Sequence, residues 1–342
     1  MKWVVSINEE DNPMTSRERV IAAVTFQGPD RVPVNLPPQW GTDFGWCGAG
    51  GDPDFVPCVK TDTEWEDEFH TIWRKLHGDK TMGQPAVYPL TDYAMLDDFD
   101  WPDYTKDVRY EASRTACANN TEDKFLLAGT PMSLIHRLEY LRGHQAAWTD
   151  AYEYPEQLHR LLNIIGDIAI AAVDRLADAG AHGMMSCDDW GLQDRPMLSP
   201  AIFAEFFKPV YKRVYHHAHE RGMLTFLHSC GHITELLEHF IEAELDVIQQ
   251  DQQENMGVEE LASRFGGRLC FWCPVDIQNT MITGTVEDVR AYARKLIDNF
   301  GRFNGGFIAQ WYASPQAVNH SQEKIDAMSQ EFVEYGGRFY QQ

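Results

Sequence analysis

Apolar and polar residues alternate along most of this chain with two different periods. Short apolar runs of strand character recur, and each is followed by a longer stretch in which apolar residues return every three or four positions, as on one face of a helix. The clearest strands cover residues 125–129, 183–187 and 224–228, and the longest helical stretch covers residues 155–179. Strands and helices that alternate in this way are typical of a parallel sheet covered by helices.

The same pattern predicts further elements. A first helix is expected over residues 14–26, capped by Thr15 or Ser16, and the segment 36–57, rich in Pro, Gly and Trp, is expected to form a long loop over one mouth of the fold. The other strands are expected at residues 31–35, 86–90, 246–250, 268–273 and 305–310, and the other helices at 134–141, 200–221, 233–243, 258–265, 286–300 and 322–335.

The strand at residues 86–90 brings the number of expected strands to eight. Eight strands with intervening helices predict a (β/α)8 TIM barrel, an α/β fold, here with an elaborated N-terminal segment. A chain of 342 residues is long for one ordinary domain, but barrels of this kind commonly reach that size. We therefore expect a single barrel domain over residues 1–342.

Composition limits the partners of such a barrel. The chain has 29 basic and 52 acidic residues and a formal net charge of −23, which argues against binding to nucleic acid or to an anionic membrane surface. Neither a run of eighteen apolar residues nor a signal-peptide pattern occurs, so we expect a cytoplasmic protein without a membrane span. Seven cysteines at irregular spacing favour thiols and metal ligands over a disulfide framework. A homodimer is compatible with the sequence.

The strand at residues 224–228 ends in His228, and Cys230 follows two positions later. Side chains two apart in a strand share a face, so the imidazole and the thiol are expected side by side at the end of the strand. Zinc readily takes nitrogen and sulfur ligands, so this pair predicts a zinc site. The carboxyl ends of barrel strands are also where active sites form.

Cys273 is the candidate for a third ligand, because it ends the strand two along from His228 and inward-facing layers of a barrel come from alternate strands. Cys270 has the opposite parity and is expected to face the helices, which argues against a redox-active Cys-x-x-Cys pair. Cys187 adjoins the same rim and is an alternative ligand. Three ligands would leave a fourth position open, as in catalytic zinc sites. The open alternative is that Cys230 and Cys273 are only small buried side chains.

Polar residues also follow the other late strands, and a purely structural barrel would not need so many at one rim, although each cluster alone is equally well explained as a helix cap or loop group. Asp189, Asp276 and Tyr312 are candidates to donate or accept a proton near the metal. Candidates for substrate binding are Trp40, Asp188, Gln193, Gln250, Asp251 and Gln310. Aromatic residues that could wall the pocket are Trp40, Phe44, Trp46, Trp190, Trp311 and Tyr312.

Six short segments stand out together along the chain. They are MTSRERV at residues 14–20, PDRVPV at 29–34, DDWGLQ at 188–193, HSCG at 228–231, FWCPVD at 271–276 and GGFI at 305–308. Their content and order resemble the uroporphyrinogen decarboxylase superfamily, and the resemblance runs from about residue 14 to about residue 335. It implies a (β/α)8 barrel and one of two chemistries.

One branch of that superfamily decarboxylates a porphyrinogen without a metal and binds its acidic side chains with arginines from an N-terminal motif. Here the corresponding stretch, NLPPQW at residues 35–40, contains no arginine, and a polyacidic substrate suits so acidic a chain poorly. The other branch consists of zinc methyltransferases of corrinoid-dependent systems, whose His-x-Cys pair is matched by His228 and Cys230. In the methylcobamide:coenzyme M enzymes a further cysteine follows the last strand, but residues 311–315 contain none, so Cys273 would replace it.

The resemblance therefore implies a zinc-dependent methyltransferase that moves a methyl group between a small substrate, for example a methoxylated compound, and a corrinoid. Aryl O-demethylases are a nearer analogy than enzymes that use coenzyme M. An Asp-x-His-x-x-Gly cobalt-ligand motif is absent, so a partner protein would carry the corrinoid. Two alternatives stay open: a metal-free decarboxylase or lyase of the uroporphyrinogen decarboxylase type, and a non-catalytic binding protein whose structural zinc is closed by Cys187 or Asp276.

Overall fold

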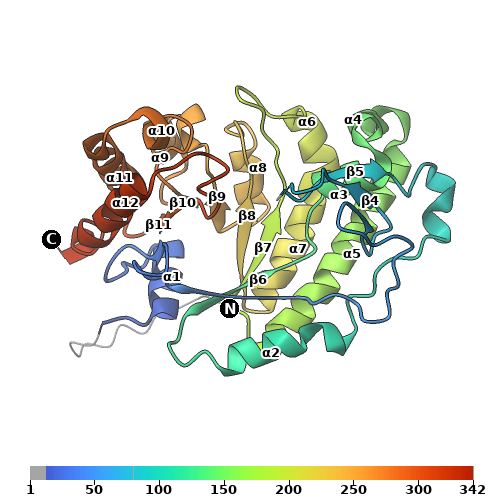
Figure 1. The fold of residues 1–342 in the computed structure, drawn as a ribbon, viewed down its shortest axis with the longest axis horizontal. Helices are drawn as coiled ribbons and strands as arrows, with labels where there is room; N and C mark the ends of the chain where they lie inside the picture. Colours follow the sequence, from blue (N-terminus) through green and yellow to red (C-terminus); the bar gives the residue numbers. More distant parts are fainter. Residues whose placement is uncertain (1–12, 80, 342) are drawn as a thin grey trace.

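The computed structural model describes residues 13–79 and 81–341, so residues 1–12, which bear on the signal-peptide expectation, lie outside the described part. Its centre is an eight-stranded sheet in which every pairing is parallel, in the order β1-β11-β10-β9-β8-β7-β6-β2. The strands are β1 (Val34–Asn35), β2 (Phe44–Gly48), β6 (Phe125–Gly129), β7 (Gly183–Cys187), β8 (Leu224–His228), β9 (Val247–Gln249), β10 (Cys270–Cys273) and β11 (Phe307–Gln310). The sheet curls into a nearly closed barrel surrounded by helices, which confirms the predicted (β/α)8 fold (Figure 1).

The barrel closes between its two edge strands, β1 and β2. The backbone N–H of Asp43 donates to the carbonyl of Val34 at 2.8 Å. The carboxylate of Asp43 is 1% exposed and accepts hydrogen bonds from the guanidinium groups of Arg19 and Arg31. Because Asp43 immediately precedes β2, this charged cluster holds the amino-terminal end of the barrel together.

The expectation of a barrel strand at residues 86–90 is wrong, and so is that of a loop throughout residues 36–57. The eighth barrel strand is β2, which lies inside the expected loop. The pattern of β2 is interrupted at Gly45, because a Cβ there would lie 2.8 Å from the side chain of Leu126 on β6, so glycine occupies a position where an apolar side chain would have completed it. A separate antiparallel sheet contains β3 (Glu64–Glu66), β4 (Ile72–Arg74) and β5 (Gln84–Val87).

Most of the predicted helices form, but the one expected over residues 233–243 begins only at Leu237, and α2, α4 and α10 were not predicted. α5, α9 and α11 begin and end at the predicted residues, and Thr15 caps α1 as expected. The helix expected over residues 200–221 is divided by a π-helical turn at Phe203–Phe207. The helices are α1 (Ser16–Val24), α2 (Glu111–Ala118), α3 (Ile135–Arg142), α4 (His144–Glu153), α5 (Pro155–Ala179), α6 (Pro200–Ile202), α7 (Lys208–Glu220), α8 (Leu237–Glu242), α9 (Val258–Phe265), α10 (Thr280–Thr283), α11 (Val286–Phe300) and α12 (Gln322–Glu334).

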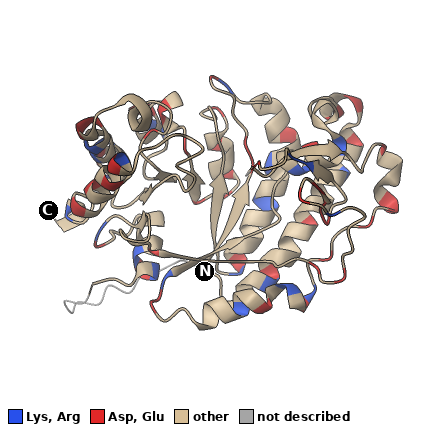
Figure 2. Ribbon diagram, viewed as in Figure 1, with Lys and Arg blue, Asp and Glu red and all other residues tan. Residues whose placement is uncertain are grey.

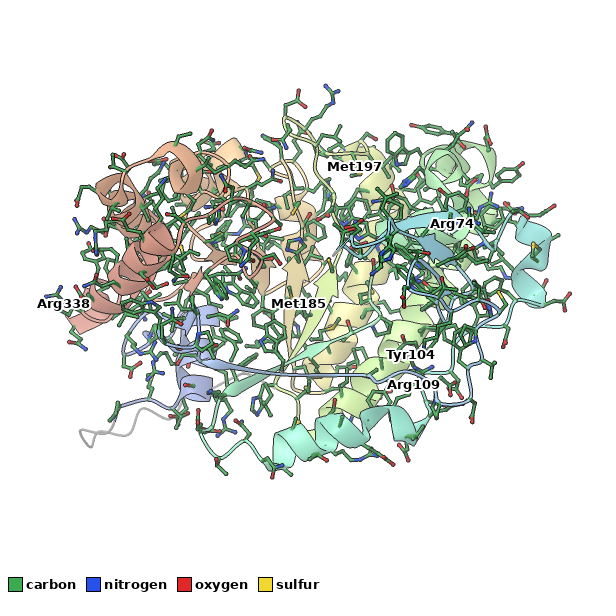
Figure 3. All side chains as sticks on the ribbon, viewed as in Figure 1. Arg74, Tyr104, Arg109, Met185, Met197 and Arg338 are labelled. Carbon is green, nitrogen blue, oxygen red and sulfur yellow. The ribbon has the colours of Figure 1, made fainter. Side chains whose placement is uncertain are left out.

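Alternate residues of the strands point into the barrel and fill it with aromatic rings. Phe44 of β2 stacks on Trp272 of β10 with ring centroids 5.0 Å apart, and the ring of Phe226 on β8 meets both edge-on. Met185 of β7 packs against the same cluster (Figure 3). Because Phe44, Phe226 and Trp272 come from strands that are not neighbours, the cluster identifies the inward faces of the strands. On β8 the inward face carries residues 224, 226 and 228.

The elaborated N-terminal segment between β2 and β6 is anchored by one arginine. Arg109 is 2% exposed and donates to the carbonyls of Gly50 at 2.9 Å and Asp103 at 2.8 Å. It also pairs with Glu68, and its guanidinium lies 4.5 Å from the centre of the Tyr104 ring (Figure 3). A buried guanidinium with this many acceptors holds the parts of this segment together.

Acidic and basic residues are interspersed along the helices and loops in the view of Figure 2, and the formal net charge of the chain is −23. Exposed ion pairs such as that of Arg268 with Glu238 connect neighbouring elements, and each contributes about 0–1 kcal/mol. Within the described residues, no helix is both long enough and apolar enough to cross a membrane.

His182 gives the fold a pH dependence. Its Nδ1 accepts a hydrogen bond from the backbone N–H of Leu126 at 2.9 Å, and burial, with the charge of Arg17, lowers its pKa to about 4. The unfolded chain binds this proton at about 6.5, so the stability contributed by neutral His182 is complete above that pH and is lost as the pH falls towards 4. Between pH 7 and 4.5 we expect this residue to account for about 2 kcal/mol of lost unfolding free energy.

Urea unfolding at both pH values tests this expectation. His182→Asn keeps an acceptor for the Leu126 N–H but does not titrate, so its stability should fall by about 2 kcal/mol less than that of the unmodified protein. Equal losses in both proteins would contradict the assignment.

Candidate metal centre

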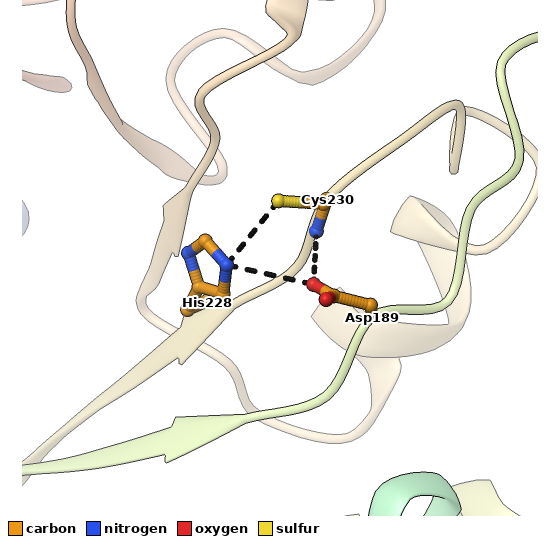
Figure 4. A group of neighbouring side chains, drawn as sticks. All are labelled: Asp189, His228 and Cys230. Carbon is orange, nitrogen blue, oxygen red and sulfur yellow. Dashed lines mark hydrogen bonds and ion pairs between the residues drawn. The ribbon is translucent and has the colours of Figure 1, made fainter. Parts of the chain in front are cut away.

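Three potential metal ligands meet at the carboxyl-terminal ends of β7 and β8. Asp189 follows β7, His228 ends β8, and Cys230 lies two residues beyond, so two neighbouring strands supply all three side chains (Figure 4). Nε2 of His228 lies 3.3 Å from Sγ of Cys230 and 3.5 Å from Oδ1 of Asp189. One ligand atom from each residue lies within 4.8 Å of the other two, and the described residues contain no second group of this kind.

These separations suit a divalent metal ion. Zinc bonds of about 2.0–2.3 Å in tetrahedral geometry place neighbouring ligand atoms roughly 3.3–3.6 Å apart. A nitrogen, a sulfur and a carboxylate oxygen are all ligands that zinc accepts, and a thiolate with a carboxylate balances its two positive charges. The three side chains are partly buried, and three ligands leave one tetrahedral position for a substrate. The ligand set therefore fits zinc.

Hydrogen bonds and a close backbone contact join the loops that carry these residues. The N–H of Cys230 donates to Oδ1 of Asp189 at 2.7 Å, and the N–H of Gly191 donates to the carbonyl of Cys230 at 3.1 Å. Gly231 adopts φ +80°, and a Cβ there would lie 2.2 Å from the carbonyl oxygen of Gly191. Only glycine allows the two loops to approach so closely, and this approach brings Asp189 to His228.

Gly231→Ala should therefore weaken metal binding, lowering zinc affinity at least about tenfold because the loops must separate. Gly222→Ala is the matched control: Gly222 has a similar φ of +73°, but a Cβ there would meet nothing within 4 Å. Both variants should lose about 1 kcal/mol of stability from the positive φ. Chelator competition measures the affinities, and equal affinities in the two variants would contradict the role given to the loop contact.

The three side chains influence one another's ionisation. Burial alone would raise the pKa of Asp189, but the contact with His228 and the N–H of Cys230 hold that pKa down at about 2. Burial opposes a charged imidazole, yet Asp189 and Cys230 raise the pKa of His228 well above its usual value. Burial also raises the pKa of the Cys230 thiol, and His228 offsets part of that shift. A metal must displace protons here, so its affinity should rise with pH.

Two residues that the sequence did not single out also contact the group. Gln249 accepts a hydrogen bond from Nδ1 of His228 through Oε1 and donates from Nε2 to Oδ1 of Asp251 at 2.8 Å. His136 of α3 accepts a hydrogen bond from the backbone N–H of Asp189 at 3.2 Å. The inward parity of β9 could have identified Gln249, but no local pattern links His136 to Asp189.

The structure does not bring Cys273 into this group, contrary to the expectation of a third ligand there. Phe271 and Cys273 lie in the core between sheet and helices, whereas Cys270 and Trp272 lie in the core inside the barrel. The parity expected for β10 is therefore reversed, because the pairing of β10 with β9 aligns Trp272, and not Cys273, with Gln249. Cys273 is fully buried, burial raises the pKa of its thiol, and Asp189 takes its place in the ligand group.

Three other expected residues lie near the group, namely Cys187, Tyr312 and Asp251. Cys187 pairs with His228 across the sheet, and partial burial of its thiol raises its pKa to about 11, although the charge of His228 opposes this shift. Burial and the charges of Asp251 and Cys230 raise the pKa of Tyr312. Gln310 ends β11, and its Oε1 is buried without a hydrogen-bond partner among the described residues.

Asp188 and Asp276 instead hold the local backbone. Asp188 is fully buried and accepts hydrogen bonds from the backbone N–H groups of Leu134 and His136 and from two hydroxyl groups, those of Ser133 and Tyr211. It thereby fixes the start of α3. Asp276 accepts from three successive N–H groups, those of residues 278–280, and so shapes the turn into α10. These carboxylates are occupied by the fold, so the substrate role of Asp188 and the catalytic role of Asp276 gain no support.

Three further substrate candidates lie apart from the ligand group. Nε1 of Trp40 donates to Asp326 on α12 at 2.9 Å, and Trp40 lines a separate cavity of about 350 Å³ near Asp43. Gln193 is exposed and accepts from Asn255 at 3.0 Å. Gln250 is fully buried, and within the described chain neither of its amide atoms has a hydrogen-bond partner.

Among the expected aromatic wall residues, Trp46 has the most open position. It is 52% exposed, and its ring stacks on Trp272 at 6.3 Å. Phe44 is buried beneath Trp272, and Trp190 is buried with its Nε1 donating to the hydroxyl of Tyr211 at 3.0 Å. Trp46 thus extends the interior stack towards solvent, while Phe44 and Trp190 belong to the core. Trp311 packs partly buried on the outer core.

Comparison with known proteins gives consistent similarities. The sequence model of the uroporphyrinogen decarboxylase (URO-D) family matches residues 80–334. Uroporphyrinogen decarboxylase from Xanthomonas axonopodis pv. citri (strain 306) is 26% identical over 243 residues, or 66% of this chain and 64% of that protein, and the enzyme from Thioalkalivibrio sulfidiphilus is 28% identical over 159 residues, or 45% and 42%. The chain thus spans less than two thirds of the length of these relatives. A methyltransferase from Methanosarcina mazei shares the fold, with a TM-score of 0.65 at 14% identity over 94% of this chain and 99% of that one.

Proposed function

This chain belongs to the uroporphyrinogen decarboxylase family, and from that premise we propose that it is a zinc-dependent methyltransferase. It would move a methyl group between a small methoxylated substrate and a corrinoid carried by a partner protein. The observation that supports this most is the meeting of Nε2 of His228, Sγ of Cys230 and a carboxylate oxygen of Asp189 at the carboxyl ends of the strands. That end of a barrel is where chemistry takes place.

Asp189, His228 and Cys230 would hold the metal. Bound zinc would supply a Lewis acid that polarises the heteroatom to which the methyl group is attached. Tyr312 keeps its proton at neutral pH, because burial and nearby acidic groups raise its pKa, so its hydroxyl can donate a proton to that heteroatom. The half-exposed ring of Trp46 offers a flat apolar surface for the substrate.

A second candidate is decarboxylation of a porphyrinogen, which the curated relatives favour. The arginines near the start of the chain speak against it. Arg19 and Arg31 both pair with Asp43, and Arg17 pairs with Asp123. Because these carboxylates precede β2 and β6, the arginines lie at the barrel end opposite His228 and are engaged by the fold rather than free for substrate carboxylates.

Methyl transfer to a corrinoid is the direct test. Zinc-loaded protein is mixed with a Co(I) corrinoid and a set of methoxylated donors, and methyl-Co(III) absorbance is followed. We expect turnover with at least one donor, its loss after chelation, and its return when zinc is restored. The absence of transfer in either direction, together with carbon dioxide release from uroporphyrinogen, would replace this proposal with the decarboxylase.

A further inference from the structure

Gln249 lies directly behind the histidine of the ligand group. It is the last residue of β9 and pairs with His228 across the sheet. Its Oε1 contacts Nδ1 of His228, and its Nε2 donates to Oδ1 of Asp251 at 2.8 Å. Gln249 is 4% exposed and Asp251 is 5% exposed, so water does not compete with these contacts. A buried line of hydrogen bonds thus runs from Asp251 through Gln249 to the far side of the His228 ring.

The direction of each hydrogen bond follows from chemistry. A carboxylate oxygen accepts, so the amide turns its NH2 group to Asp251 and its carbonyl oxygen to His228. A carbonyl cannot donate, so Nδ1 of His228 must carry the proton. Nε2 is then the nitrogen left to face Asp189 and Cys230, at 3.5 and 3.3 Å.

We propose that Gln249 is a positioning residue that holds His228 with Nδ1 protonated and Nε2 turned to the metal, with Asp251 fixing the orientation of the Gln249 amide. The inference rests on the metal centre of the proposed function. Hydrogen-bond partners behind a metal-bound histidine fix its tautomer and ring orientation, and their loss typically lowers metal affinity about 10- to 100-fold.

The next residue supplies a matched control. Gln250 is as deeply buried as Gln249, but within the described chain its amide makes no hydrogen bond. It follows Ile248 on the side of β9 that faces the helices, whereas Gln249 follows Val247 on the inward side. Removing the amide at residue 250 therefore changes buried volume and polarity without touching His228.

The first test measures zinc and cobalt(II) affinity by chelator competition in three variants. Gln249→Met, which keeps the length but loses the acceptor, should bind about 10- to 100-fold more weakly. The double variant Gln249→Glu/Asp251→Asn reverses the polarity of the contact between the two residues, so that the amide at residue 251 donates to a carboxylate that still accepts from Nδ1, and its affinity should return to within about threefold of the unmodified protein. Gln250→Met should not differ from the unmodified protein. Equal weakening in Gln249→Met and Gln250→Met, or none in Gln249→Met, would overturn the proposal.

A second measurement needs no metal. In ¹H–¹⁵N spectra of metal-free protein labelled at histidine, the Nδ1 proton of His228 should exchange slowly with water, remain slow in Gln249→Glu/Asp251→Asn, and exchange fast in Gln249→Met. If the unmodified protein binds no metal but shows this slow proton, the proposed function fails and the role of Gln249 stands. If metal binds but the proton is not protected, the role of Gln249 fails and the metal centre stands.

Discussion

Cys230→Ala is expected to reduce bound zinc from about one ion per chain to below about 0.1, and to lower methyl transfer by at least about a thousandfold. The variant loses the only sulfur of the ligand group. His228 and Asp189 remain as the only two members of that group, too few for a tight zinc site. Metal analysis of protein purified without chelator measures the first effect, and the corrinoid assay measures the second.

Cys273→Ala is the control for this prediction. Cys273 is buried between sheet and helices, outside the ligand group, so its replacement should leave the zinc content unchanged and cost about 1 kcal/mol of stability from the small cavity. Retention of zinc in Cys230→Ala with its loss in Cys273→Ala would reverse the assignment of the third ligand. Circular dichroism of both variants would show that each is folded.

Replacement of Asp188 is expected to lower stability, whereas replacement of the adjacent Asp189 is expected to lower zinc affinity. Asp188→Ala should lower the free energy of unfolding by about 3–5 kcal/mol, because the N–H groups of Leu134 and His136 and the hydroxyl of Tyr211 lose their common acceptor in a fully buried position. The start of α3 and the packing of α7 depend on that acceptor. Urea unfolding of the metal-free protein measures the loss.

Asp189→Asn should change stability by less than about 1 kcal/mol, since an amide oxygen can still accept from the N–H of Cys230. Its zinc affinity should nevertheless fall about 10- to 100-fold, because a neutral amide replaces a charged ligand. An Asp188→Ala protein of unchanged stability would contradict the structural role of Asp188. Full zinc affinity in Asp189→Asn would contradict the role of Asp189 as a ligand.

The helices and most strands of this barrel follow from local pattern. Residues 155–179, 258–265 and 286–300 form helices with the predicted ends, and residues 183–187 and 224–228 form the predicted strands. A helical stripe and an apolar run depend on neighbours in the chain, so they are legible without the fold. The strand at Phe44–Gly48 could not be predicted in this way, because Gly45 interrupts its apolar pattern where Leu126 of the neighbouring strand β6 leaves no room for a side chain.

The candidate site likewise has one part that could be predicted from the sequence and one part that could not. His228 and Cys230 are two residues apart on one strand, so the sequence alone could pair them. The third candidate ligand depends on the register between strands and on the contact between two loops, which are set by residues distant in the sequence. The register of β10 against β9 places the side chain of Cys273 between sheet and helices, away from the ligand group. The close approach of Gly191 and Gly231 places Asp189 beside His228.

The sequence by itself thus determined a parallel α/β barrel and a histidine beside a cysteine at a strand end. Only the tertiary structure decided that Asp189 completes the group and that Gln249 lies behind His228. The reason is physical: side-chain parity within a strand is local, but which residue of one strand lies beside which residue of the next is settled by packing of the whole barrel.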